Sequence, residues 1–172
     1  MSSVRQMHVA DAELVADIQV RGWRATYPGI LPQEVLDNLD VTKAAEQWRL
    51  GIEKNPDIVR LVALEASIVR SYLVGGENRF TALVPAVPGE IWALYTDPDH
   101  QGRGYGKALL AEFWSRCPHG FCVSVATGND RARAFYEQMG GRYVVDHGRQ
   151  VGGKDVPHGL LSFLPPASPG SA

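Results

Sequence analysis

The chain has 172 residues, of which 45% are hydrophobic and 9% aromatic, so it holds material for one core of ordinary domain size. Its 17 basic and 19 acidic residues nearly cancel to a formal charge of -2 and are interspersed, which argues against nucleic acid as a ligand. No apolar run approaches the roughly 20 residues that span a bilayer, and the first residues are too polar for a signal peptide. We therefore expect a cytoplasmic protein that does not engage a membrane.

The N-terminal third is expected to be largely helical. After a first strand over residues 4–9, Asp11 is expected to cap an amphipathic helix. The inward face of this helix would carry Leu14, Val15 and Ile18. Pro28 and Gly29 end the pattern, and Thr42 is placed to cap a later helix. One face of that later helix would carry Ala45, Trp48 and Ile52.

The rest of the chain alternates between strand and helix patterns. Two β-branched stretches, 58–65 and 68–73, are typical of adjacent antiparallel strands, and Gly75 with Gly76 is expected to end the second. Residues 81–88 hold two prolines and are expected to form a loop or a poor edge strand. Further strands are expected over 90–96, 121–126, 142–146 and about 156–164, with helices after Gly106 and after Asn129. This order predicts an α/β (α+β mixed) sheet in one domain over 1–164, followed by a disordered proline-rich tail over 165–172.

The two cysteines do not form a recognisable redox or metal motif. Cys117 and Cys122 are separated by Pro118, His119 and Gly120, which fits neither a CxxC pair nor a zinc spacing. We therefore predict two reduced thiols, no disulfide and no metal.

Three glycines at alternate positions form the most informative segment of the sequence. Gly102, Gly104 and Gly106 lie between an expected strand and an expected helix, where successive backbone N–H groups can point into one concavity. The first turn of the helix adds unpaired N–H donors and the positive end of its dipole. The segment is therefore a candidate phosphate-binding loop, which Arg103 and Lys107 could supplement.

Spacing separates the loop from two common phosphate-binding motifs. A Walker A loop needs glycine at position 101 and Ser or Thr at position 108, where the chain has Gln101 and Ala108. A dinucleotide fingerprint needs glycine at position 107 or 109, where the chain has Lys107 and Leu109. A flexible glycine turn without a ligand remains as the plain alternative.

Two motifs resemble those of a known family. The pattern Gln-x-x-Gly-x-Gly, read at Gln101, Gly104 and Gly106, resembles the acetyl-CoA-binding motif of the GCN5-related N-acetyltransferase (GNAT) superfamily, bacterial type. Residues 129–140 resemble its second motif, N-x-x-A-x-x-F-Y-x-x-x-G, without a mismatch. The resemblance is specific over about 90–141 and implies a mixed, mostly antiparallel sheet of six to seven strands flanked by helices. Homodimers are common in this family, so the resemblance also allows a homodimer.

The resemblance implies an N-acetyltransferase that uses acetyl-CoA as co-substrate and acts on a primary amine of a small molecule or peptide by direct attack in a ternary complex. A catalytically silent acyl-CoA-binding module on the same fold remains the alternative. An unrelated nucleotide-binding domain is disfavoured by the two failed spacings. The residues implied to bind the cofactor are Leu94, Tyr95, Thr96, Gln101, Gly102, Arg103, Gly104, Tyr105, Gly106, Lys107, Asn129 and Tyr136.

The resemblance also suggests catalytic roles. Tyr136 matches the general-acid position of the family, although its spacing also suits a core aromatic. Glu90 begins the central strand, where several members place a carboxylate that acts as base through water, and a solvated strand-end glutamate is the alternative. His100 and His119 are weaker candidates for the base.

Trp23 and Tyr27 are candidates for the acceptor site. They lie one helical turn apart, so they share a helix face. They could form a wall of the acceptor pocket or pack in the core.

Overall fold

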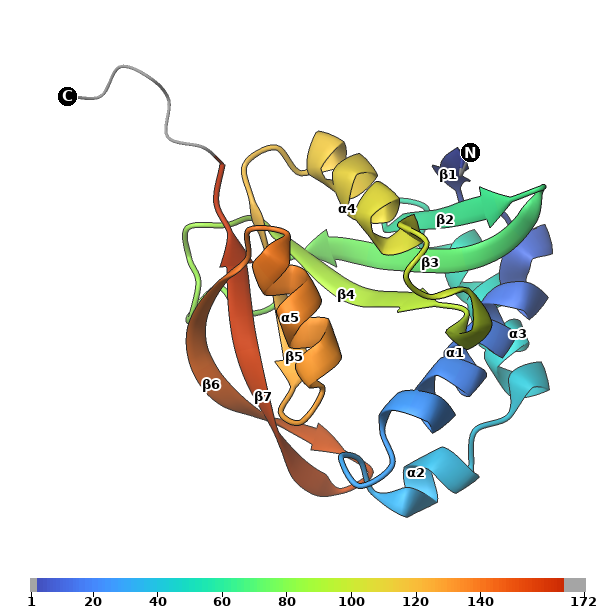
Figure 1. Ribbon diagram of the computed structural model, residues 1–172, viewed down its shortest axis with the longest axis horizontal. Coiled ribbons are helices and arrows are strands. Elements are labelled where there is room, and N and C mark those ends of the chain that lie inside the picture. Colours follow the sequence, from blue (N-terminus) through green and yellow to red (C-terminus); the bar gives the residue numbers. More distant parts are fainter. Residues whose placement is uncertain (1–2, 166–172) are drawn as a thin grey trace.

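The computed structural model describes residues 3–165, whose strands form one seven-stranded sheet (Figure 1). The strands are β1 (Ser3–Gln6), β2 (Val59–Glu65), β3 (Ile68–Glu77), β4 (Gly89–Thr96), β5 (Phe121–Ala126), β6 (Arg142–Val151) and β7 (Lys154–Phe163). The helices are α1 (Ala12–Thr26), α2 (Gln33–Asp37), α3 (Val41–Lys54), α4 (Tyr105–Arg116) and α5 (Asp130–Gln138), with 3-10 turns η1 (Val9–Asp11) and η2 (Pro98–His100).

The sheet is mixed and mostly antiparallel. Its strand order is β1-β2-β3-β4-β5-β7-β6, and β4 with β5 is the parallel pair among the described strands. The crossover between these two strands is α4. This arrangement confirms the predicted fold class.

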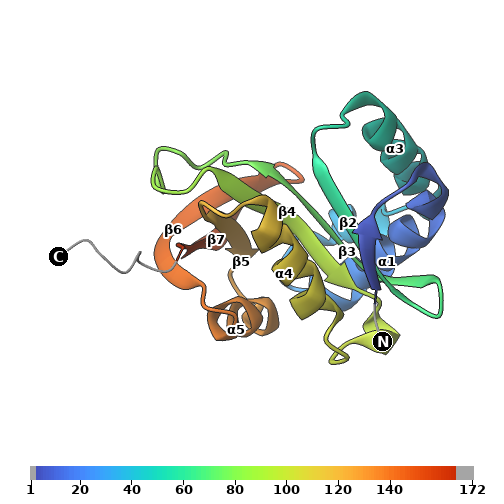
Figure 2. The same cartoon turned by 90° about the horizontal axis from the view of Figure 1, so that it is seen from above.

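Helices cover both faces of the sheet, α4 and α5 on one face and α1 and α3 on the other (Figure 2), and a hydrophobic cluster lies beneath each pair. Leu61 and Ala63 of β2 belong to the core beneath α4 and α5, whereas the alternating Val62 and Leu64 belong to the core beneath α1 and α3. Because successive side chains of a strand point to opposite faces, a strand buried on both sides reads as a continuous apolar run. This explains why residues 61–64 are apolar without interruption.

The ends of the N-terminal helices differ from the sequence expectation. The side chain of Asp11 does not cap α1. It accepts hydrogen bonds from the His8 N–H (2.7 Å) and from Arg5, and these lower its pKa although burial alone would raise it. Leu14 points outward and is 45% exposed. The cap of α3 is Asp40 rather than Thr42, because the Asp40 carboxylate accepts the Lys43 N–H at 2.8 Å.

Strand β3 continues through the two glycines that were predicted to end it. A Cβ atom at Gly75 would lie 2.5 Å from the Phe113 ring, and one at Gly76 would lie 2.7 Å from the Trp92 ring. The glycines therefore let α4 and β4 approach the strand closely, and they do not mark a turn.

The parallel strands β4 and β5 separate after a short paired segment. Their pairing covers Gly89 to Ile91 on β4 and Phe121 to Val123 on β5. A register shift in the β3–β4 pairing leaves Trp92 without a directly opposed residue on β3. From there to Thr96, the β4 edge has no β5 partner in the described pairing, so backbone hydrogen-bonding groups face an opening.

The β6–β7 hairpin is longer than predicted and reaches the N-terminal helices. Its turn has Gly152 and Gly153 at φ 56° and 74°, in the left-handed region that favours glycine. A Cβ atom at Gly152 would lie 2.4 Å from Cγ2 of Val35, so the turn packs against α2.

Several other expectations concern absences or the chain end. Cys117 and Cys122 are both free thiols. Over residues 3–165, no helix has the length and apolar character needed to cross a membrane, and no group of three or more metal-ligating side chains comes together. Apart from Pro165, the tail expected over 165–172 lies outside the described residues.

Candidate active site

The glycine loop presents an open backbone surface. Gly102 and Gly104 have φ angles of 79° and 84°, and an added Cβ atom at either position would meet nothing within 4 Å. Gly104 is the N-cap of α4, and Ala108 donates to its carbonyl at 3.0 Å. The N–H groups in the first turn of α4 therefore have no acceptor within the helix. These features fit a bound pyrophosphate, because N–H donors and the helix dipole converge on free space.

Asp97 anchors the approach to this loop. Its carboxylate is 2.8 Å from Nδ1 of His100, 3.1 Å from Arg21 of α1 and 3.5 Å from Arg70 of β3. Burial would raise the pKa of Asp97, but the Asp99 N–H and the Arg21 and His100 charges outweigh it and lower the pKa. His100, a weaker candidate for the base, is thus one of the side chains that contact the Asp97 carboxylate.

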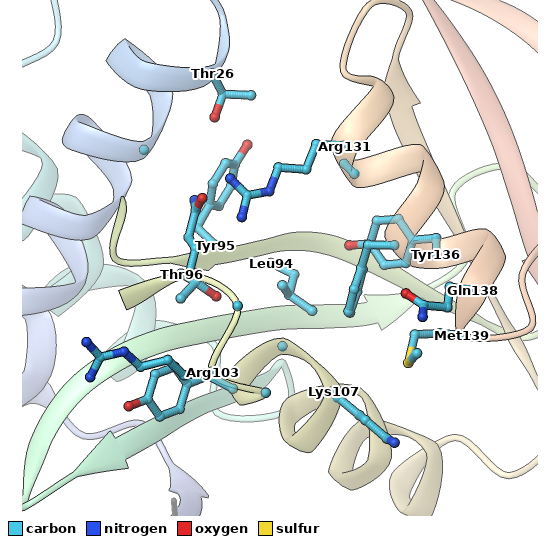
Figure 3. A pocket seen from close by; sticks show the side chains of 18 of the residues that line it. Thr26, Leu94, Tyr95, Thr96, Arg103, Lys107, Arg131, Tyr136, Gln138 and Met139 are labelled. Carbon is cyan, nitrogen blue, oxygen red and sulfur yellow. The ribbon is translucent and has the colours of Figure 1, made fainter. Parts of the chain in front are cut away.

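The loop borders a cavity of about 450 Å³ between α4, α5 and the open edge of β4 (Figure 3). Every residue predicted to bind the cofactor lines this cavity. Sequence reasoning did not identify the other lining residues, which are Gly22, Thr26, Arg131, Ala132, Phe135, Gln138 and Met139. Arg131 occupies a variable position of the second motif, and it extends from the start of α5 into the cavity (Figure 3).

Asn129 and Tyr105 line the cavity, but each offers only some of its polar groups to a ligand. The side-chain oxygen of Asn129 accepts the Ala132 N–H at 3.2 Å and caps α5, so its amide NH2 group is left to donate to a ligand. The Tyr105 side chain lies in the core at 3% exposure. Its contribution to a ligand site therefore comes from its backbone N–H at the start of α4.

Tyr136 combines a buried ring with a hydroxyl group that points into the cavity (Figure 3). The residue is 5% exposed, and its ring packs edge-on against Phe135 and Phe163. Burial, together with the proximity of Tyr27, raises the pKa of the phenol above its ordinary value. The ring is therefore part of the core, as the packing interpretation expected, and the hydroxyl faces the cavity; the general-acid role stays a prediction.

A second cavity, of about 540 Å³, lies on the α1 side of β4. Its aromatic lining residues are Trp23, Tyr27, Trp48, Tyr72, Trp92 and Tyr95. Its other lining residues are Gln19, Leu31, Val74, Ala93, Ser124, Ala126, Arg149, Gln150, Val151, Gly152 and His158. Tyr95 lines both cavities, and its hydroxyl group is 2.8 Å from that of Tyr27. The structure therefore places both predicted acceptor residues, Trp23 and Tyr27, in a cavity that adjoins the one bordered by the glycine loop.

Glu90 lies away from both cavities. It is 1% exposed, and its carboxylate accepts hydrogen bonds from the Arg79 guanidinium at 2.6 and 3.0 Å and from the Arg79 N–H at 2.9 Å. Glu90 lies at the start of β4, as expected. Its carboxylate is neither open to the cavity beside the glycine loop nor exposed to solvent. His119 is exposed on the loop after α4 and lines neither cavity.

Two histidines meet at the wall formed by β5, β6 and β7. His158 is 6% exposed and lines the second cavity, and its Nδ1 lies 2.8 Å from the Val156 carbonyl. Because a carbonyl only accepts, Nδ1 of His158 carries a proton and Nε2 is the acceptor of the neutral ring. On the neighbouring strand, Nε2 of His147 lies 2.9 Å from the hydroxyl of Ser124. Sequence reasoning missed His158, because its apolar neighbours gave no motif.

The free N–H groups at the start of α4, the open edge of β4 and the Tyr136 hydroxyl on α5 that faces the cavity are features expected of an acyl-CoA-binding site. The model of the acetyltransferase (GNAT) family matches residues 25–141, and the chain belongs to this family. The predicted resemblance is thereby confirmed.

Individual relatives agree with this assignment. The chain is 29% identical over 112 residues to YuaI, an uncharacterised N-acetyltransferase of Bacillus subtilis (strain 168), and the match spans 65% of this chain and 62% of that protein. Arabidopsis thaliana NAA60, solved with a bisubstrate analogue, is similar in fold, with a TM-score of 0.72 at 16% identity over 98% of this chain and 100% of that one. The PaiA N-acetyltransferase of Thermoplasma acidophilum, solved with coenzyme A, has a TM-score of 0.66 at 18% identity over 92% and 98%.

Proposed function

We propose that this protein transfers the acetyl group of acetyl-CoA to a primary amine of a small molecule or peptide by direct attack in a ternary complex. The observation that carries the proposal is the meeting of two cavities at Tyr95, one bordered by the glycine loop and the other by aromatic side chains. Two ligands held on either side of this residue would have their reacting groups close together. Such positioning converts a bimolecular attack into an effectively unimolecular one.

The donor side is assigned to the loop and the β4 edge. Backbone N–H groups from Gly102 to Lys107 would hold the pyrophosphate, and Lys107 adds a positive charge that no described residue neutralises. Arg103 contributes less, because it already lies 3.5 Å from Glu65. The unpaired β4 edge over 94–96 would bind the pantetheine arm as an added strand. When bound, the thioester supplies an activated acetyl group.

Tyr136 is proposed as the general acid. No described residue forms a hydrogen bond with its hydroxyl group, which faces the donor cavity. A phenol is protonated at neutral pH, so a proton is available when negative charge develops on the departing sulfur.

His158 is proposed as the group that takes the proton from the amine. Its Nε2 is an acceptor, the residue lines the acceptor cavity, and none of the cavity-lining residues described here is an Asp or Glu. Burial lowers its pKa, with His147 and Arg149 acting in the same direction, so the ring is neutral at physiological pH. Glu90 instead receives a structural role, because Arg79 occupies its carboxylate.

The test follows free thiol during incubation of the protein with acetyl-CoA and a panel of polyamines, aminoglycosides, amino acids and peptides. The proposal expects thiol release that depends on the amine. Calorimetric titration with acetyl-CoA runs in parallel, with the Gly104→Val variant as the control for the loop. Tight binding without amine-dependent release across the panel would favour the silent acyl-CoA-binding module.

A further inference from the structure

The acceptor cavity has a rigid aromatic wall. Trp23 packs edge-on against Tyr27, and Trp48 packs edge-on against Tyr72, with ring centroids 5.5 and 5.2 Å apart. The Trp48 indole N–H donates to Gln19 at 2.7 Å, so the polar end of this ring is already satisfied. Such a wall offers flat apolar surface to a ligand at little conformational cost.

Two polar groups of the same wall lack partners. The indole Nε1 atoms of Trp23 and Trp92 are buried and have no hydrogen-bond partner within the described part of the chain. An indole N–H can only donate, and a buried donor without an acceptor is unfavourable. Neither atom is exposed to solvent, so a ligand in the cavity would reach them only if the rings moved.

The charges around the cavity also favour an anion. Its described lining includes Arg149 but no Asp or Glu, and Arg149 is exposed without a hydrogen bond or salt bridge to residues 3–165. The nearby Asp155 is bound by Gln150 at 3.3 Å and does not line the cavity. A guanidinium with free donors matches the geometry of a carboxylate or another oxyanion. A polyamine would instead bring further positive charge beside Arg149 with no carboxylate to receive it.

The far end of the cavity is bounded by the chain itself. The turn residue Gly152 lines the cavity and packs against Val35 of α2, and Leu31 lines the cavity from the segment between α1 and α2. The hairpin end and α2 lie side by side at this edge of the molecule (Figure 1). A compact ligand fits this boundary better than an extended chain.

We infer that the acceptor is a small amine that carries an oxyanion and a flat or bulky apolar group, as in an aromatic α-amino acid. The inference rests on the proposed function and specifies its substrate class. In the reaction, the amine nitrogen bonds to the acetyl carbon, the carbon–sulfur bond breaks, the nitrogen loses one proton and the sulfur gains one. The oxyanion is not consumed and serves to hold the acceptor against Arg149.

The experiment compares acceptors with one aromatic body and different charges. These are phenylalanine, its phosphonate analogue, phenylalanine amide and phenethylamine, with spermidine as a polycation. We expect kcat/KM for phenylalanine or its phosphonate to exceed that for the amide by at least about tenfold. The two anionic compounds distinguish a carboxylate site from a phosphonate site.

A matched pair of variants assigns the preference to Arg149. Arg149→Gln should remove most of the preference for the anionic acceptors, so that the ratio of kcat/KM between phenylalanine and its amide falls toward one. Lys154→Gln removes a positive charge from the same hairpin, away from the cavity, and should keep the preference. Equal efficiency for the amide or for spermidine in the wild-type protein would overturn the inference, as would an unchanged preference in Arg149→Gln.

Tryptophan fluorescence supplies a readout that needs no turnover, because Trp23, Trp48 and Trp92 line the cavity. Phenylalanine should alter the emission at lower concentration than its amide does, and no difference would overturn the inference. If the proposed acetyltransferase function itself is wrong, the result differs, because acetyl-CoA then does not bind or none of the amines causes thiol release. Thiol release with spermidine alone would keep the acetyltransferase and exclude the anionic acceptor.

Discussion

The hydroxyl oxygens of Tyr27 and Tyr95 lie 2.8 Å apart, and this contact joins the C-terminal end of α1 to the open edge of β4. Burial, and then Tyr27, raises the pKa of Tyr95 well above its ordinary value, so its hydroxyl remains neutral. The pair stands where the two cavities meet. In the proposed reaction it would therefore set the distance between the two ligands.

Removing either hydroxyl should weaken acceptor use through the same lost contact. Tyr27→Phe and Tyr95→Phe are each expected to raise KM for the acceptor about fivefold, the equivalent of one hydrogen bond of about 1 kcal/mol. Because both variants break one interaction, the double variant should be no worse than either single one. Steady-state kinetics at saturating acetyl-CoA measures KM for the wild type, the two single variants and the double variant. Additive losses would show that the two hydroxyls act separately.

Tyr136→Phe tests the proposed general acid. Loss of the hydroxyl should lower turnover at least about tenfold, because the departing sulfur loses its proton donor. The affinity for acetyl-CoA should stay within about threefold, since the ring that packs on Phe163 is retained. Single-turnover rates and calorimetric titration separate the two effects. Tyr143→Phe, at an exposed β6 position, is the control, and unchanged turnover in Tyr136→Phe would remove Tyr136 from the mechanism.

Gly104→Val tests the loop as the site of the pyrophosphate. A branched side chain would project where an added Cβ now meets open space, and it would strain a residue at φ 84°. We expect acetyl-CoA binding to be abolished in calorimetric titration. Gly29→Val imposes the same kind of strain at φ 78°, also in open space, but outside the loop, and it should keep the affinity. Full affinity in Gly104→Val would mean that the loop does not hold the cofactor.

The parts of the fold and site that could be predicted are those encoded locally. Gly102 and Gly104 were identified because their backbone conformation favours glycine and their spacing excludes other phosphate loops. The second motif was identified by its resemblance to the family pattern N-x-x-A-x-x-F-Y-x-x-x-G, and in the structure Asn129 caps α5, the helix that carries Tyr136. In both segments, the residues that act together are close in the sequence.

The parts that could not be predicted depend on contacts between distant segments. Arg79, the partner of Glu90, lies in the segment after β3, and no sequence pattern joins the two. Arg149 reaches the second cavity because the β6–β7 hairpin extends to α2, and the polar residues 147–155 gave no strand signal. His158 lies in an expected strand, but nothing in the sequence placed that strand beside the cavity. The two glycines in β3 resembled a strand end because their close neighbours, Phe113 and Trp92, come from other elements.

The pH dependence of kcat/KM tests His158 as the proton acceptor. Burial holds the pKa of His158 below 6.5, so its protonation should add a further acid limb below that pH to the decline that protonation of the acceptor amine imposes. His158→Asn should lose this limb and fall about 100-fold at pH 7.5. The exposed His119, changed to Asn, is the control. A limb that persists in His158→Asn would assign the proton to another group.

Stability must be followed across the same pH range. A histidine with a lowered pKa binds a proton less readily in the folded protein than in the unfolded chain. Its contribution to stability therefore declines as the pH falls below the ordinary value of 6.5. Thermal unfolding at each pH separates this loss from the kinetic limb.

Variants of Glu90 and Arg79 test whether the Glu90 carboxylate has a structural role or acts as the catalytic base. Glu90 is 1% exposed, whereas the Arg79 side chain is 49% exposed and can turn toward water when its partner is lost. Arg79→Met should therefore destabilise the protein by about 3 kcal/mol, because it leaves a buried carboxylate without its partner. Glu90→Gln should lower the stability by less. Chemical denaturation measures both losses of stability. Arg116→Met, which breaks an exposed pair, is the control and is expected to cost under about 1 kcal/mol.

With folded Glu90→Gln, kcat should stay within about twofold of the wild type, since the carboxylate lies away from both cavities. A fall in kcat of about 100-fold without loss of stability would instead restore Glu90 as the base.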